Sequence, residues 1–187
     1  MKNSPVWSQE KYLQAFHFAA RAHSGQKYAG SDLPYIMHIA MVCMETIAAL
    51  EVEPVDDPDL AVQCALLHDV IEDTPVRKNK IAEIFGKDVA DGVELLSKKM
   101  KIKDKEKRFS EYLALLANAP KEIQMVKLAD RISNLQAPPF HWDQEKIAAY
   151  REKSLTILNI LGSASSYLSE RLQEKIAAYP PGPNHLG

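Results

Sequence analysis

Apolar residues recur every three or four positions along almost the whole chain, which is the spacing of one face of an α-helix. The strict alternation of apolar and polar residues that is typical of a β-strand is nearly absent. Glycine, proline and aspartate gather between the periodic segments and mark their ends. The helices that we expect cover residues 8–21, 34–50, 58–73, 77–85, 87–98, 120–135, 143–161 and 164–179, with one more that follows the basic residues 98–108 and ends near 118. The pattern therefore predicts an all-α protein, a bundle of about eight to ten helices.

The length of 187 residues fits one domain. We expect a single domain over residues 1–187, with an ordered core at about 8–179 and a flexible tail at 180–187 that begins with Pro-Pro-Gly-Pro. A hydrophobic fraction of 46% and a charged fraction of 26% exclude disorder for most of the chain. A net charge of −2 argues against a general nucleic-acid binder, which needs an excess of basic residues.

Membrane association is also not expected, because the most apolar segment, residues 36–50, contains a histidine, a glutamate and a threonine. The N-terminal residues lack the apolar stretch of a signal peptide. Cys43 and Cys64 lie in apolar segments and form neither a disulfide framework nor a C-x-x-C motif. We therefore expect a cytoplasmic protein, either a monomer or a homodimer.

An unusual group of ionisable residues lies at the end of the expected helix 58–73. His68, Asp69, Glu72 and Asp73 fall on one arc of a regular helix, in which each residue turns by about 100°, and the other positions around them are apolar. Buried carboxylates need compensation, and a divalent cation can provide it. His68 and Asp69 would be ligands, and Glu72 and Asp73 would reach a metal-bound water one turn further along.

Two more segments offer ligands of the same kind. Residues 127, 130, 131 and 134 share one helical face, so that Asp130 can add a metal oxygen while Lys127, Arg131 and Asn134 bind carboxylates of the site or an anionic substrate. His38 lies just inside a helix whose other residues are apolar. Two histidines and two aspartates form a mixed nitrogen and oxygen site that suits Mn, Fe or Zn better than Ca or Mg.

Four segments carry a family resemblance: AARAHSGQKYAGSDLPYIMH, ALLHDVIEDT, EIFGKDVADGVELLSKK and VKLADRISNL. They resemble the HD superfamily of metal-dependent phosphohydrolases, and more narrowly the hydrolase domain of RelA/SpoT proteins and the stand-alone small alarmone hydrolases. The resemblance extends from about residue 10 to residue 175 and implies a single HD-type helical domain. It implies that the metal ligands are His38, His68, Asp69 and Asp130, and that the catalytic acidic pair is Glu72 and Asp73. The ion implied is one Mn²⁺, with Fe or Zn as alternatives.

The reaction that the resemblance implies is removal of the 3′-diphosphate from ppGpp or pppGpp, which yields GDP or GTP and pyrophosphate. A metal lowers the pKa of bound water toward ~7, and the acidic pair would orient that water and move its proton. The substrate-binding residues that we expect are Lys27, Tyr28, Lys98, Arg131, Asn134 and Tyr150. His23 is expected to be structural or to orient a ligand from behind.

The substrate loop leaves other functions open. Relatives usually carry Gly-Gln-x-Arg, whereas Lys27 and Tyr28 follow Gln26 here. The alternatives are an HD phosphohydrolase that acts on an adenosine alarmone (pppApp or ppApp) or on the 2′-phosphate of NADPH, and a catalytically silent relative that only binds a nucleotide. The intact acidic pair speaks against the silent relative.

Overall fold

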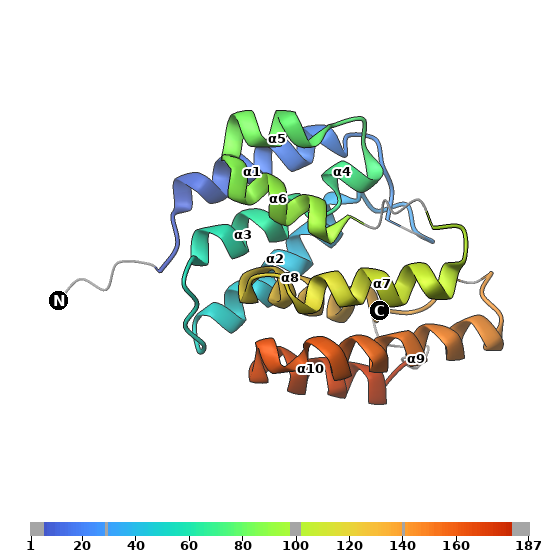
Figure 1. Cartoon of the computed structure of the whole chain (residues 1–187). Coiled ribbons are helices and arrows are strands. Elements are labelled where there is room, and N and C mark those ends of the chain that lie inside the picture. Colours follow the sequence, from blue (N-terminus) through green and yellow to red (C-terminus); the bar gives the residue numbers. More distant parts are fainter. Residues whose placement is uncertain (1–5, 29, 98–101, 140, 181–187) are drawn as a thin grey trace.

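The structure is a computed structural model that describes residues 6–28, 30–97, 102–139 and 141–180. Within these residues the chain forms ten α-helices and one 3₁₀ turn, and no strand longer than an isolated bridge (Figure 1). The elements are α1 (Gln9–Ala22), α2 (Ile36–Leu50), α3 (Pro58–Leu67), α4 (Val70–Asp73), α5 (Lys78–Phe85), α6 (Lys87–Leu96), α7 (Lys105–Ala117), α8 (Lys121–Asn134), α9 (Gln144–Leu161), the 3₁₀ turn η1 (Gly162–Ala164) and α10 (Ser166–Ala177). The all-α prediction is confirmed.

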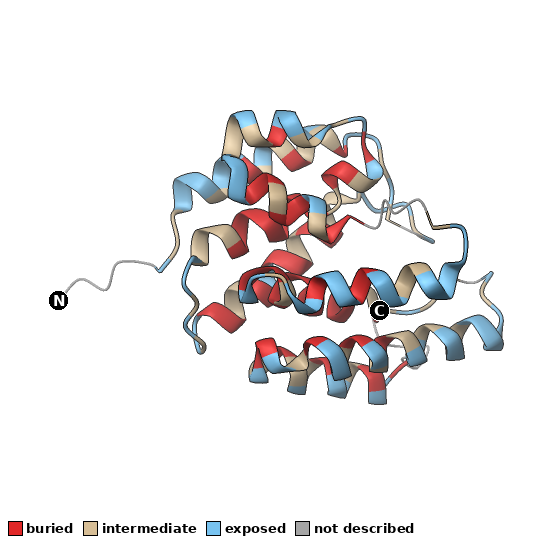
Figure 2. Cartoon of the chain, in the orientation of Figure 1, coloured by how far each residue is buried: buried red, intermediate tan, exposed pale blue. Residues whose placement is uncertain are grey.

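Three helices, α2, α3 and α8, form the centre of the molecule, where they pack against one another. Helix α1 lies on α3, the α5–α6 pair covers α3 from the same side, and α9 and α10 pack on the opposite side against α8 (Figure 1). Figure 2 shows the buried residues concentrated in the central helices, while α5, α7 and α9 expose much of their surface. Every residue of 61–67 in α3 is buried, which agrees with its almost continuous apolar sequence.

Capping residues account for several helix boundaries. The Ser8 hydroxyl accepts the backbone N–H of Lys11 at 3.4 Å, as the pattern predicted for the start of α1. Pro58 occupies the first turn of α3, and the Asp57 carboxylate caps that helix. The expected helix 164–179 begins instead at Ser166, because Ser165 is extended and its hydroxyl caps α10 after the 3₁₀ turn.

The prediction of one continuous helix over residues 58–73 was wrong. Helix α3 ends at Leu67, His68 and Asp69 form a turn, and α4 begins at Val70. The Nδ1–H group of His68 donates to the Ala65 carbonyl at 2.9 Å, an oxygen that accepts the Asp69 amide in a regular helix. The side chain therefore competes with the backbone ladder at the point where the helix breaks.

No helix in the described ranges is both long and apolar enough to cross a bilayer. The tail expected to be flexible lies outside the described residues from 181 onward, and its flexibility stays a prediction.

Candidate metal centre

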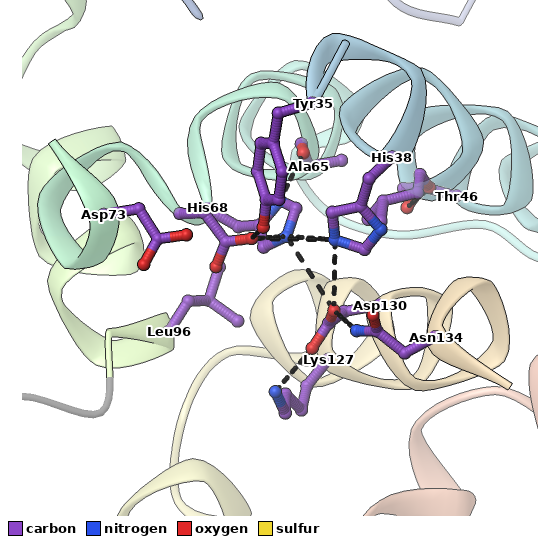
Figure 3. Close-up of polar contacts among 12 residues, drawn as sticks. Tyr35, His38, Thr46, Ala65, His68, Asp73, Leu96, Lys127, Asp130 and Asn134 are labelled. Carbon is purple, nitrogen blue, oxygen red and sulfur yellow. Dashed lines mark hydrogen bonds and ion pairs between the residues drawn. The ribbon is translucent and has the colours of Figure 1, made fainter. Parts of the chain in front are cut away.

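Side chains from three separate segments meet in the interior between α2, α3 and α8 (Figure 3). His38 comes from the first turn of α2, His68 and Asp69 from the turn after α3, and Asp130 from α8. The Nε2 atoms of the two histidines lie 3.3 Å apart. The Asp69 carboxylate is 2.9 Å from Nε2 of His68 and 3.6 Å from Nε2 of His38. The Asp130 carboxylate is 3.5 Å from Nε2 of His38 and 3.8 Å from Nε2 of His68.

These separations fit the donors of one metal ion. Nitrogen and oxygen ligands bind transition ions at about 2.0–2.2 Å, so neighbouring ligand atoms stand roughly 2.8–3.6 Å apart for angles between 90° and 109° and slightly further apart for wider angles. The ligand atoms of His38, His68 and Asp130 all lie within 4.8 Å of one another, and these three side chains are buried. Two imidazoles and carboxylate oxygen form a donor set that suits Mn, Fe or Zn.

The ligand atoms are oriented by neighbouring groups. Because the Ala65 carbonyl only accepts, Nδ1 of His68 carries a hydrogen, and Nε2 is the ring nitrogen that faces the cluster. The Lys127 ammonium donates to Oδ2 of Asp130 at 2.5 Å, and the Asn134 amide donates to Oδ1 at 2.5 Å. The sequence left open whether these two residues bind carboxylates of the site or an anionic substrate, and in the structure both contact Asp130.

Tyr35 is a residue of the site that the sequence reasoning missed. Its hydroxyl donates to Oδ2 of Asp69 at 2.5 Å, and its ring packs 5.3 Å from the ring of His38. Burial and the neighbouring Asp69 raise the pKa of the Tyr35 hydroxyl, so it remains a hydrogen-bond donor. The signal available in the sequence was its position three residues before His38, one helical turn away.

In the cluster without a metal ion, a proton on His38 offsets the negative charges of Asp69 and Asp130. Burial lowers the pKa of His38, but hydrogen bonds to Asp130 and Asp69 outweigh burial and raise this pKa to about 9. Burial raises the pKa of Asp69, but the attraction of His68 and the hydrogen bond from His38 hold it well below its ordinary value. A metal ion that binds here must therefore displace a proton from His38.

The two residues of the predicted catalytic pair lie outside the ligand cluster. Glu72 and Asp73 belong to α4, where Glu72 is half-buried and Asp73 is exposed. Figure 3 shows Asp73 to one side of His38, His68 and Asp130. Its Oδ2 accepts a hydrogen bond from Nε2 of Gln26 at 3.3 Å. Asp73 therefore lies beside the cluster and is open to solvent, where a carboxylate can exchange protons, and Glu72 precedes it on the same short helix.

A cavity of about 530 Å³ adjoins the metal centre through Tyr28, whose ring stacks on the ring of His38 at 5.8 Å. Its wall combines Tyr28, Met37 and Met41 with residues 136–139, and the described lining is uncharged. Burial, followed by nearby tyrosine and aspartate groups, raises the pKa of Tyr28 to about 12, so its hydroxyl stays protonated.

The remaining expected substrate residues are placed differently. The Arg131 guanidinium lies 4.4 Å above the ring of Tyr150, and its Nε and Nη1 atoms are buried without a partner in the described part of the chain. Lys27 is exposed and pairs with Asp32 at 2.5 Å, and no described contact links it to the cluster. Lys98 lies outside the described residues.

A helical bundle with histidine and aspartate side chains around a His-Asp step is the arrangement of HD-domain proteins. The family model for the HD domain matches residues 15–165 of this chain. The chain belongs to the HD-domain family. It is 30% identical over 173 residues to the guanosine-3′,5′-bis(diphosphate) 3′-pyrophosphohydrolase MESH1 of Drosophila melanogaster, a match that covers 88% of this chain and 92% of that protein.

A second relative is the bifunctional (p)ppGpp synthase/hydrolase SpoT of Escherichia coli, which is 36% identical over 133 residues. That match covers 68% of this chain but 18% of SpoT, so the chain corresponds to less than a fifth of the longer protein. A solved structure of a metazoan SpoT orthologue that hydrolyzes ppGpp has the same fold, with a TM-score of 0.79 at 23% identity over 91% of this chain and 96% of the other. The expected HD-type fold is confirmed.

Proposed function

We propose that this protein is a metal-dependent hydrolase that removes the 3′-diphosphate from guanosine 3′,5′-bis(diphosphate) and from its 5′-triphosphate analogue. The observation that carries the proposal is the meeting of His38, His68, Asp69 and Asp130 at ligand distances from three separate segments. The match to MESH1 supports the substrate, because it covers nearly the whole of both chains.

One Mn²⁺ ion is the metal that we assign to these four side chains, with Fe and Zn as alternatives. Such an ion supplies a Lewis acid for phosphate oxygen and lowers the pKa of bound water toward ~7. The protein contributes the orientation of the ligands: Lys127 and Asn134 fix the Asp130 carboxylate, and Tyr35 fixes that of Asp69.

The reaction balances as a simple hydrolysis. Water forms a new P–O bond at the phosphorus attached to the 3′ oxygen, and the bond between this phosphorus and the 3′ oxygen breaks. The 3′ oxygen leaves with a proton, so that the products are GDP or GTP and pyrophosphate. The acidic pair of Glu72 and Asp73 takes up the proton of the attacking water, because Asp73 lies beside the ligand cluster and is open to solvent.

The nucleoside occupies the 530 Å³ cavity, with its base against Tyr28, Met37 and Met41. Arg131 supports the phosphates, because its buried guanidinium has donors that no described residue uses. Tyr150 holds that guanidinium by stacking. Lys27, Lys98 and Asn134 complete the proposed substrate contacts.

A second candidate function is hydrolysis of an adenosine alarmone or of the 2′-phosphate of NADPH. The uncharged lining of the cavity supports this second candidate. A wall without charges binds any purine, so that only a few polar groups select the base. Both candidates use the same metal centre and differ in the nucleotide and in the phosphate product.

The test is a substrate panel with Mn²⁺-loaded protein: ppGpp, ppApp and NADPH, with pyrophosphate and orthophosphate measured separately. The proposal predicts fastest turnover of ppGpp with release of pyrophosphate. Asp69→Ala should abolish turnover and reduce bound metal, whereas Asp88→Ala, at an exposed carboxylate of α6, should change neither. Binding of ppGpp without product, or full metal content and turnover in Asp69→Ala, would contradict the proposal.

A further inference from the structure

A chain of hydrogen bonds leads from the buried His23 to the exposed Asp73. His23 follows α1 and is 4% exposed, and its Nδ1 lies 2.7 Å from Oε1 of Gln26. The other end of the Gln26 amide donates from Nε2 to Oδ2 of Asp73 at 3.3 Å. An ionised carboxylate only accepts, so Gln26 must present its NH₂ group to Asp73 and its oxygen to His23. The hydrogen of His23 must then be on Nδ1.

The loop that carries Gln26 is itself fixed at both ends. The backbone N–H of Gln26 donates to the His23 carbonyl at 3.0 Å, and the Gln26 carbonyl accepts the N–H of Tyr35 at 2.9 Å. The remaining ring nitrogen of His23, Nε2, is buried and has no partner among the described residues. Among the described residues, the contact with Gln26 is therefore the hydrogen bond that determines which ring nitrogen of His23 carries the hydrogen.

The same histidine touches the metal side of the site. Its ring lies 4.9 Å from the ring of Tyr35, whose hydroxyl holds the Asp69 carboxylate. His23 thus contacts two partners, one that holds a metal ligand and one that holds a carboxylate of α4. Asp69 is held by contacts with Tyr35, His38 and His68, whereas Asp73 is an exposed side chain on a helix of four residues.

We infer that Gln26 and His23 are positioning residues that fix the rotamer of Asp73 for proton transfer, a role that rests on the proposed function. A carboxylate that moves a proton must hold one oxygen within hydrogen-bond reach of the attacking water. An exposed carboxylate on a short helix samples several rotamers, and the hydrogen bond from the side-chain amide of Gln26 favours one of them. His23 in turn prevents the Gln26 amide from rotating, because the reversed amide would place two donors against each other.

A purely structural role makes a different prediction. His23 also ends α1, where its backbone N–H donates to the Ala19 carbonyl, and its ring packs on Tyr35. If packing is all that it contributes, substitution lowers thermal stability and metal affinity, and the loss of turnover follows from them. Gln26 separates the two roles, because it is half-buried in a loop and bonds to Asp73 rather than to a metal ligand.

The hydrogen-bond arrangement can be tested without turnover. Long-range ¹H–¹⁵N NMR of the chelator-treated protein should show His23 with its hydrogen on Nδ1, and Gln26→Leu should remove this preference. A wild-type His23 with its hydrogen on Nε2 overturns the inference.

Its role in catalysis is tested with a double-variant cycle on Mn²⁺-loaded protein and ppGpp. Gln26→Leu should lower kcat roughly 10- to 100-fold, the effect of a small misplacement of a reacting group, while KM and metal content stay unchanged. In an Asp73→Asn background the same substitution should cause no further loss. His23→Leu should resemble Gln26→Leu, whereas His23→Asn, which keeps an N–H near Nδ1, should retain most of kcat.

Gln14→Leu, at an exposed glutamine of α1, is the matched control and should leave kcat unchanged. An equal loss from Gln26→Leu with and without Asp73, or a loss confined to KM or metal content, overturns the positioning role. Absence of turnover in the wild type overturns the proposed function and the role that rests on it, while the tautomer still reports whether the hydrogen-bond chain exists. The two failures are therefore distinguished.

Discussion

Metal binding by the chelator-treated protein is expected to release about one proton per ion at pH 7, and that proton comes from His38. The carboxylates of Asp130 and Asp69 raise the pKa of His38 to about 9 against the effect of burial. At pH 7, two units lower, about 100 rings are protonated for each neutral one, and only the neutral imidazole binds a metal. Asp69 adds no proton, because its pKa lies well below the ordinary value. The apparent affinity should therefore rise about tenfold per pH unit between pH 6.5 and 8.5.

Two measurements check this expectation. Titration calorimetry at pH 7 in two buffers of different ionisation enthalpy counts the protons released, and competition with a coloured chelator gives the affinity at each pH. Asp69→Asn removes one of the carboxylates that hold the proton on His38, so its affinity should level off at a lower pH. Proton release near zero, or an affinity that does not change over this range, would refute the charge balance derived for the cluster.

The same proton makes stability depend on pH in a definite direction. Because the pKa of His38 is about 9 in the folded protein and about 6.5 when unfolded, its contribution to the metal-free fold is complete below pH 6.5 and lost as the pH rises through 9. The contribution is on the order of 3 kcal/mol, since one pKa unit corresponds to about 1.4 kcal/mol. The difference in unfolding free energy between wild type and His38→Gln isolates it. A difference that grows from pH 6.5 to pH 9 would contradict the sign.

Three substitutions test other parts of the structure. Tyr35→Phe removes the donor to Asp69 and should weaken Mn²⁺ binding about 10- to 100-fold in equilibrium dialysis; unchanged binding would show that the hydroxyl does not orient the ligand. Arg171→Met leaves the buried Glu45 without its bidentate partner and should lower the free energy of unfolding in urea by about 2–3 kcal/mol, less than for a fully buried pair because the Arg171 side chain is 37% exposed. Adding Glu45→Leu should recover part of that loss. Gly92→Ala places a methyl group 2.6–2.7 Å from side chains of α8 and α3 and should cost about 1–3 kcal/mol; an unchanged urea midpoint would mean that these helices move apart freely.

Much of the fold could be predicted because helical periodicity is local information. The stripe on α8 that contains Lys127, Asp130 and Asn134 was predicted from i, i+3, i+4 and i+7 spacing, and the structure brings these side chains together at the candidate metal centre. The helix boundaries at Ser8 and Pro58 were readable from capping preferences.

What could not be predicted depends on contacts between segments far apart in the chain. Tyr35 and Asp69 are 34 residues apart, and Gln26 and Asp73 are 47 apart, so no spacing rule connects them. The apolar sequence around His68 favours a helix throughout and gives no sign of the break after Leu67, where the Nδ1–H group of His68 donates to the Ala65 carbonyl.

Under the proposed function, this break separates the metal ligands from the groups that move protons. His68 and Asp69 keep helical backbone dihedrals in the turn, and Nε2 of His68 lies 2.9 Å from Oδ2 of Asp69. The same turn places Glu72 and Asp73 on a new helix at the edge of the ligand cluster. Burial strengthens the electrostatic attraction between metal ligands and an ion, whereas groups that exchange protons with water need exposure. A helix broken at its His-Asp step meets both needs within six consecutive residues.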